Sequence, residues 1–145
     1  MNNRQICFFS EISSLSVSEL KVEIDEIVWS LSHGSQLIPI KCEEIAYLYK
    51  ASYIEKRRFI SLLGGYARKE SIAHEIKRCE PRHKDTFDHV LILIQTSTEH
   101  PLIMSELQIL DNITTGISPK AEIRWGVGIN DKLGDRIFLM VIYSK

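Results

Sequence analysis

The spacing of apolar residues along the chain predicts four helices. The clearest one covers residues 16–33, where apolar side chains recur every three or four positions and form one face of an amphipathic helix. Ser16 and Glu19 have the spacing of a capping box at its start, and Gly34 suits its end because glycine accepts a left-handed conformation. Shorter helices are predicted at 42–52, 69–79 and 104–115. In the last of these, Glu106 lies in the first turn, Leu107, Leu110 and Ile113 are expected to face inward, and Gly116 is expected to end the helix.

Other segments have the composition of β-strands, and four strands are predicted, at 57–63, 90–94, 122–129 and 137–143. Residues 90–94 are all aliphatic, which is typical of a central strand covered on both faces. In 122–129 every second residue is a large apolar one, so these side chains form one inward-facing row. The turn-rich residues 130–135 are predicted to link the last two strands as a hairpin.

Two short segments complete the pattern. Residues 6–9 are apolar and form either a strand or a docking tail, and residues 37–40, which include Pro39, form an extended connector. Farther along the chain, helices alternate with strands. This order indicates an α/β fold in which helices pack on a mixed four-stranded sheet.

Composition and charge are those of an ordinary globular protein with one domain. The 145 residues are 44% apolar and 26% charged, and the formal net charge is -1. With so little net charge, no overall field draws the chain to nucleic acid or to anionic lipid. No signal peptide is visible, and the longest apolar run is far too short to span a membrane. We therefore expect a cytoplasmic protein with neither nucleic acid nor membrane among its partners.

The residue types that carry chemistry do not form a recognisable site. The cysteines Cys7, Cys42 and Cys79 are widely spaced and odd in number, which argues against both a zinc motif and a disulfide framework. The five histidines show no metal-binding spacing. The basic stretches at 56–58 and 77–84 have the character of solvated surface, since acidic residues lie in and beside the second. The sequence thus predicts no metal, no cofactor and no catalytic residue.

The last strands carry a family resemblance. Residues 125–142 read Trp-Gly-Val-Gly-Ile-Asn-Asp-Lys-Leu-Gly-Asp-Arg-Ile-Phe-Leu-Met-Val-Ile, and they resemble the closing hairpin of the FtsZ/tubulin-like filament GTPases. Residues 89–96 and 102–113 resemble the buried strand and the helix that precede it in that family. The likeness covers 37–145 and is clearest from residue 86 onward. It implies an α/β domain like the C-terminal domain of FtsZ at 37–145, with an N-terminal segment at 1–36 that bears the amphipathic helix.

The resemblance also bears on nucleotide chemistry. In these GTPases a separate N-terminal domain binds GTP through a glycine-rich phosphate loop, whereas the only adjacent glycines here are Gly64 and Gly65. The family's acidic catalytic loop, N-x-D-F-x-D, matches residues 39–44, which read Pro-Ile-Lys-Cys-Glu-Glu. Lys41 replaces the first acidic residue, so the carboxylate pair is broken although Glu44 keeps the last position. The resemblance therefore implies no enzyme activity and no nucleotide bound by this chain alone.

The loop residues Lys41, Glu43 and Glu44 are instead candidates for a protein contact. Alternatively, Glu43 and Glu44 merely stabilise the first turn of a helix. The function that these expectations favour is a non-catalytic protein-interaction domain, linked to filament assembly or cell division, that binds another protein or a second copy of itself. The alternatives are an excised domain of a larger FtsZ-like GTPase and a small-ligand-binding domain of similar fold.

Overall fold

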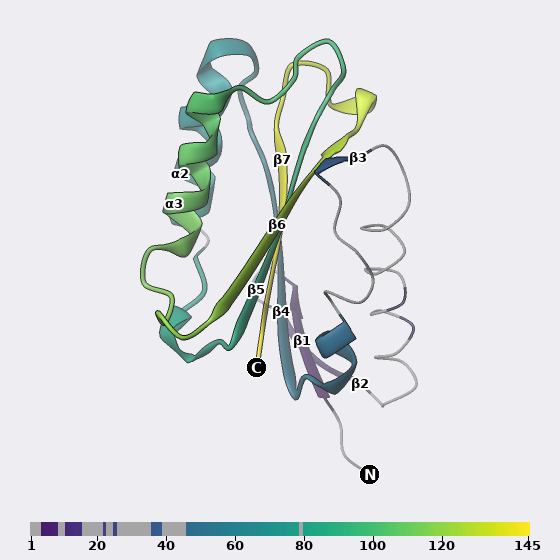
Figure 1. Cartoon of the computed structure of the whole chain (residues 1–145), viewed down its shortest axis with the longest axis vertical. Helices are drawn as coiled ribbons and strands as arrows, with labels where there is room; N and C mark the ends of the chain where they lie inside the picture. Colours follow the sequence, from purple (N-terminus) through teal and green to yellow (C-terminus); the bar gives the residue numbers. More distant parts are fainter. Residues whose placement is uncertain are drawn as a thin grey trace.

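The computed structural model describes residues 4–8, 11–15, 22, 25, 36–38, 46–78 and 80–145. Within them, seven strands form one mixed sheet in the order β2-β1-β4-β7-β5-β6-β3 (Figure 1). The strands are β1 (Arg4–Phe8), β2 (Glu11–Leu15), β3 (Gln36–Ile38), β4 (Tyr53–Ile60), β5 (His89–Thr96), β6 (Glu122–Ile129) and β7 (Phe138–Ser144). The four predicted strands correspond to β4, β5, β6 and β7, which are neighbours in the sheet, so the α/β fold class is confirmed.

Three strands were not among the four predicted. β1 lies parallel to β4 and β2 lies antiparallel to β1, so residues 4–15 belong to the same sheet as the rest. The stretch at 6–9 is thus a strand over its described part. β3 takes up part of the predicted connector at 37–40 and pairs with β6.

The helices predicted at 69–79 and 104–115 are confirmed, and they cover the same face of the sheet (Figure 1). α2 (Arg68–Arg78) follows the short 3-10 helix η3 (Gly65–Ala67), and α3 (Gln108–Thr114) continues the 3-10 turn η5 (Met104–Leu107). Of the helix predicted at 42–52, the structure describes a 3-10 turn, η2 (Ala46–Lys50), on the opposite face. The remaining 3-10 turns are η4 (Lys84–Thr86) and η6 (Asp131–Leu133). Most of the helix predicted at 16–33 lies outside the described residues.

The sheet is covered on both faces because its central strands are apolar on both. Val90, Ile92 and Ile94 of β5 join the cluster under α2 and α3, which we call the helix-side cluster. Leu91 and Leu93 join the cluster under η2, which we call the η2-side cluster. β7 alternates in the same way between the two clusters. The prediction for residues 90–94 is therefore confirmed.

The hairpin predicted for the last two strands is wrong. β6 pairs with β5, which lies between β6 and β7, so residues 130–137 carry the chain across the end of β5. The physical reason is burial: a strand that is aliphatic on both faces gains most from a place in the middle of the sheet. A short polar link is compatible with either arrangement.

Three smaller expectations also need correction. β4 begins at Tyr53 and ends at Ile60, and its charged residues Glu55, Lys56 and Arg57 are buried, so Lys56 and Arg57 of the basic stretch at 56–58 are not the solvated surface that was expected. Ile123, placed in the inward-facing row, is 41% exposed. Along η5 and α3 the buried apolar side chains are Ile109 and Ile113, whereas Leu107 and Leu110, both expected to point inward, are half-buried.

Candidate protein-interaction surface

One end of the molecule carries a hollow between the start of α2 and the loop that follows β5. Its volume is about 490 Å³, and it is open to solvent on one side. Gly65, Tyr66 and Arg68 line it from η3 and α2, and His100 and Ile103 line it from the loop. Gly65 has φ +59, a left-handed conformation in which a side chain would be strained. This glycine lets the chain turn sharply from β4 into α2.

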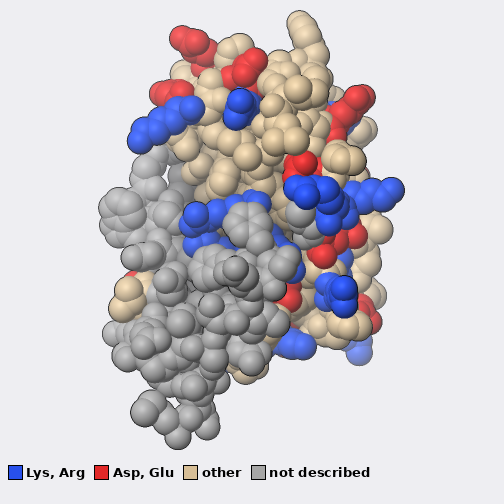
Figure 2. Space-filling model, turned by 180° about the vertical axis from the view of Figure 1, so that it is seen from behind, with Lys and Arg blue, Asp and Glu red and all other residues tan. Residues whose placement is uncertain are grey.

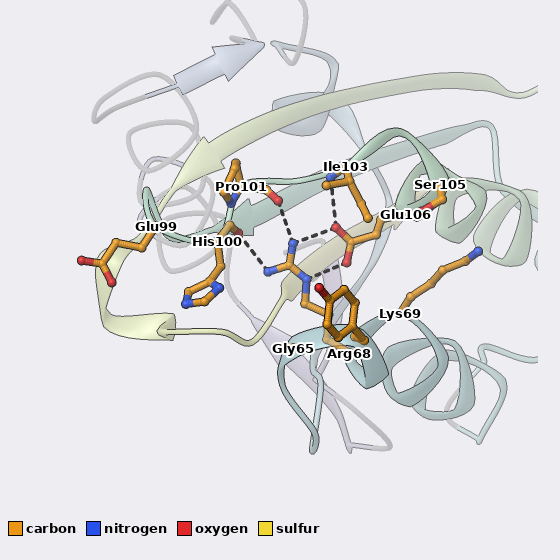
Figure 3. Close-up of a pocket in the computed structure, with 10 residues that line it drawn as sticks. Gly65, Arg68, Lys69, Glu99, His100, Pro101, Ile103, Ser105 and Glu106 are labelled. Carbon is orange, nitrogen blue, oxygen red and sulfur yellow. Dashed lines mark hydrogen bonds and ion pairs between the residues drawn. The ribbon is translucent and has the colours of Figure 1, made fainter.

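A buried ion pair joins the two sides of this hollow (Figure 3). The Nε and Nη2 atoms of Arg68 donate to the two carboxylate oxygens of Glu106 at 2.6 and 2.7 Å. The guanidinium also donates to the carbonyl oxygens of His100 and Pro101, at 2.9 and 2.8 Å. Glu106 in turn accepts a hydrogen bond from the backbone N–H of Ile103 at 3.0 Å. Each charge is therefore matched by a charge and by main-chain partners, which is the condition under which a buried ion pair is tolerated.

Further hydrogen bonds hold the loop after β5 against the turn that leads to β7. The Ser97 hydroxyl donates to the carbonyl oxygen of Gly134. The backbone N–H of Thr98 donates to the carboxylate of Asp131 at 2.8 Å. This bond lowers the pKa of Asp131, because it stabilises the charged carboxylate. The loop is thus fixed at both ends.

Large apolar side chains project from this fixed frame into solvent. We call Leu62, Leu63, Tyr66, Ile103 and Met104 the apolar rim. Tyr66 is fully exposed and Met104 is 82% exposed. The backbone N–H groups of Leu62 and Leu63 donate to the Ser71 hydroxyl at 2.9 and 3.1 Å, which holds this turn on α2 rather than in the sheet. Seen from behind, uncharged atoms predominate toward this end of the molecule (Figure 2).

The chemistry of this arrangement suits contact with a protein better than it suits a reaction. Arg68 and Glu106 are the buried ionisable groups of the hollow, and they already neutralise each other. Lys69 donates to Gln108 at 2.7 Å. The groups left to meet a partner are chiefly aromatic, aliphatic and thioether side chains, the types that are enriched where proteins bind one another. The hollow has the size of a small-ligand site, but its buried charged groups, Arg68 and Glu106, are directed at each other rather than at a ligand.

The residues predicted for a protein contact, Lys41, Glu43 and Glu44, lie outside the described residues. Among the residues that are described, no cluster of three metal-ligating side chains occurs. None of the described helices is long and apolar enough to cross a membrane.

Sequence reasoning missed most of this surface. Leu62 and Leu63 were assigned to a strand, and Arg68 received no role. The signal that was present is the pair Gly64-Gly65 directly after Leu62 and Leu63, because adjacent glycines mark a turn at which a buried strand ends. Glu106 was placed in the first turn of a helix, as the structure shows, but its partner is 38 residues away and no local pattern connects the two.

Comparison with known proteins was made by sequence and by structure. No family model and no curated protein matches the sequence. The structure is similar to that of an FtsZ dimer from M. jannaschii, with a TM-score of 0.64 and 14% identity, over 90% of this chain and 40% of that one. It is also similar to TubZ from Bacillus thuringiensis serovar israelensis in a GTPγS-form protofilament, with a TM-score of 0.58 and 12% identity, over 77% of this chain and 29% of that one.

This chain spans less than half the length of the FtsZ and TubZ chains that it matches. At such low identity the similarity concerns the fold, and it agrees with the resemblance seen in the strands and helices of 86–145. The chain therefore has the fold of one part of the FtsZ and TubZ proteins, that of a domain like the C-terminal domain of FtsZ.

Proposed function

We propose that this chain is a protein-interaction domain without catalytic activity of its own, and that it binds a subunit of the FtsZ or TubZ type through the apolar rim. One observation carries the proposal: five large apolar side chains are exposed around the starts of α2 and η5, on a frame that an ion pair and several hydrogen bonds hold rigid. An exposed apolar surface of this kind marks a place where another molecule binds.

The rigidity of the frame strengthens the case. Binding orders the loops and side chains of an interface, and this ordering opposes association. Here the loop after β5 is already held by Arg68, and the turn after β4 is held by Ser71. A partner that covers the rim therefore gains the burial of apolar area with little loss of conformational entropy.

The similar structures supply the class of partner. The FtsZ structure is that of a dimer, and the TubZ structure is that of a protofilament. Both are subunits that associate with subunits of the same fold. A domain with that fold and an exposed apolar end is suited to bind to such a filament, in a role linked to filament assembly or cell division.

The test is co-sedimentation of the purified chain with a polymerised FtsZ-type protein. We expect the wild-type chain to pellet with the polymer, and a Tyr66→Ser/Met104→Ser variant to bind at least about tenfold more weakly, because apolar anchors dominate binding energy. Lys120→Ala, an exposed change in the turn between α3 and β6, is the control and should bind as the wild type does. Circular dichroism checks that the rim variant is folded.

Three results would overturn the proposal. The first is a wild-type chain that stays in the supernatant, and the second is a rim variant that pellets as well as the wild type. The third is GTP hydrolysis by the purified chain alone, which would show catalysis where none is proposed.

A second candidate is a domain of a larger filament GTPase, and the observation in its favour is the coverage of only 29 to 40% of the similar chains. A phosphate-binding loop encoded in the same reading frame upstream would establish it. Binding of GTP by the longer product, measured by calorimetry, separates it from the first candidate.

A further inference from the structure

Within the part of the chain that the structure describes, one edge of β6 is unpaired along more than half of its length. On one side it pairs with β5 through all eight residues, from Glu122 to Ile129. On the other side β3 pairs with it only at Val127 and Gly128. Among the described strands, none pairs with residues 122–126 on that side. Figure 1 shows β6 as the nearest strand, with β3 beside its upper end alone. An open strand edge is a template for another strand.

The hydrogen bonds to β5 establish which main-chain groups point to this edge. The N–H of Glu122 donates to Asp88 at 2.9 Å, and the N–H of Asn130 donates to Thr96 at 2.9 Å. The main-chain groups of even-numbered residues therefore face β5. Because successive residues of a strand direct these groups to opposite sides, Ile123 and Trp125 direct theirs to the open edge.

The side chains along the edge have a particular order of charge. Ile123 is 41% exposed and lies between Glu122 and Arg124, whose side chains are both on the η2 face of the sheet. Glu122 lies 3.5 Å from Arg124 and 3.6 Å from Nδ1 of His89. His89 stacks on Tyr47, and burial raises the pKa of this tyrosine to about 12. Along this edge an acidic residue (Glu122), an apolar residue (Ile123) and a basic residue (Arg124) therefore follow one another, in a strand that is hydrogen-bonded to β5 along its whole length.

We propose that β6 of a second copy of this chain pairs antiparallel with this edge, about a two-fold axis at Ile123. The two sheets then become one continuous sheet. Antiparallel pairing about this axis sets Ile123 opposite Ile123 of the partner subunit, and the two residues exchange both of their outward main-chain hydrogen bonds. It also sets Glu122 opposite Arg124 of the partner subunit, twice by symmetry. Opposite charges in directly facing positions stabilise a strand pair.

Charge and geometry exclude the neighbouring registers. If the two-fold axis moves by one residue toward the carboxyl end of β6, Arg124 faces Arg124 of the partner subunit. If it moves by one residue toward the amino end, Glu122 faces Glu122 of the partner subunit. Both bring like charges together, which destabilises the pair. A larger shift toward the carboxyl end meets β3 at Val127. The sequence Glu-Ile-Arg is therefore complementary to itself in one antiparallel register, and this complementarity favours a second copy over an unrelated peptide.

The experiment exchanges charges between copies. Oligomeric state is measured by sedimentation velocity at concentrations up to about 1 mM. We expect the wild type to dimerise, and Glu122→Lys and Arg124→Glu each to weaken the dimer at least about tenfold because like charges then face each other. A mixture of the two variants should restore association, since the lysine introduced in one copy then faces the glutamate introduced in the other. Ile123→Pro, which removes an outward N–H and keeps the bonds to β5, should prevent it.

The mixture distinguishes the proposed pairing from mere damage to the fold, because damage in both variants would not be repaired by mixing them. A wild type that stays monomeric over the whole range overturns the proposal, as does a mixture that associates no better than its components. The inference is independent of the proposed function: the edge variants should still pellet with filaments, and the Tyr66→Ser/Met104→Ser variant should still dimerise. Each proposal can therefore fail without the other.

Discussion

Arg68 and Glu106 show how much one pair of residues organises in this molecule. Their side chains are 6% and 3% exposed, and they join α2 to the turn that begins α3. Two charges removed from water lose their hydration, and only close opposite charge and hydrogen bonds offset that loss. Here both are present, because the backbone of the intervening loop supplies two carbonyl oxygens and one N–H. The pair therefore positions the loop and, with it, the apolar rim.

Removal of one partner should be far more damaging than removal of both. We expect Arg68→Met to lower the free energy of unfolding by about 3–5 kcal/mol, since it leaves Glu106 charged and buried. The double change Arg68→Met/Glu106→Leu should lose less stability than Arg68→Met alone, because it leaves no buried charge without a partner. Urea unfolding followed by circular dichroism measures the free energy of unfolding of the wild type, of the single variant and of the double variant. The control is Arg78→Ala, which removes a 63% exposed arginine side chain from its pair with Glu75 and should lose no more than about 1 kcal/mol. Equal losses at both arginines would contradict this account.

At the scale of elements, the ends of helices and strands depend on single residues. α3 ends where Thr115 becomes extended and Gly116 takes φ +88. The prediction that Gly116 ends this helix is thus confirmed. β4 ends for a different reason, because the N–H groups of Leu62 and Leu63 bond to Ser71 instead of to a neighbouring strand. Hydrophobicity alone would have continued this strand through both leucines.

The left-handed conformation at Gly116 should be measurable as a loss of stability. We expect Gly116→Ala to destabilise the protein by about 1–2 kcal/mol, because a Cβ atom in this conformation is too close to the following carbonyl oxygen. Nothing lies within 4 Å of the added methyl group, so backbone strain is the whole effect. Gly116→Asn should recover much of the loss, since asparagine tolerates this conformation. The measurement is the thermal unfolding of the wild type and of the two Gly116 variants. An alanine variant as stable as the wild type would show that the left-handed conformation at residue 116 causes no strain.

At the scale of the whole molecule, the sheet is stabilised most at its centre. β7 lies between β4 and β5, and β5 lies between β7 and β6, so both strands are bonded on two sides and covered on two faces. Among the described strands, β2 is bonded to β1 alone. The strands nearest the centre contribute to both clusters, whereas β6 leaves Ile123 exposed toward the open edge.

This gradient predicts the pattern of amide hydrogen exchange. The amides of Val90–Ile94 and Leu139–Tyr143 that bond within the sheet should exchange slowest, at a rate limited by global unfolding. The amides of β2 should exchange through smaller local openings, because only β1 holds that strand. Exchange followed by mass spectrometry or NMR gives the rates. Uniform protection across the sheet would mean that it opens as one unit and would contradict the expectation.

Local patterns in the sequence were sufficient to locate α2, α3 and the four central strands, although not to place the ends of β4. Their apolar residues recur with the period of the element itself, and glycine or a polar cluster marks each end. The buried strand 90–94 was recognisable because a strand covered on both faces has no polar alternation. Similarly, the resemblance to the FtsZ fold could be seen because it depends on the order and spacing of these elements.

Tertiary structure alone decided which strands are neighbours and where the exposed apolar surface lies. β5 separates β6 from β7, and Arg68 meets Glu106, because burial and hydrogen bonding join residues that are distant along the chain. Main-chain hydrogen bonds between strands are nearly independent of side-chain identity, so sequence periodicity carries little information about pairing or about an open edge. Burial of Glu55, Lys56 and Arg57 likewise depends on what covers β4, which no property of those residues reveals.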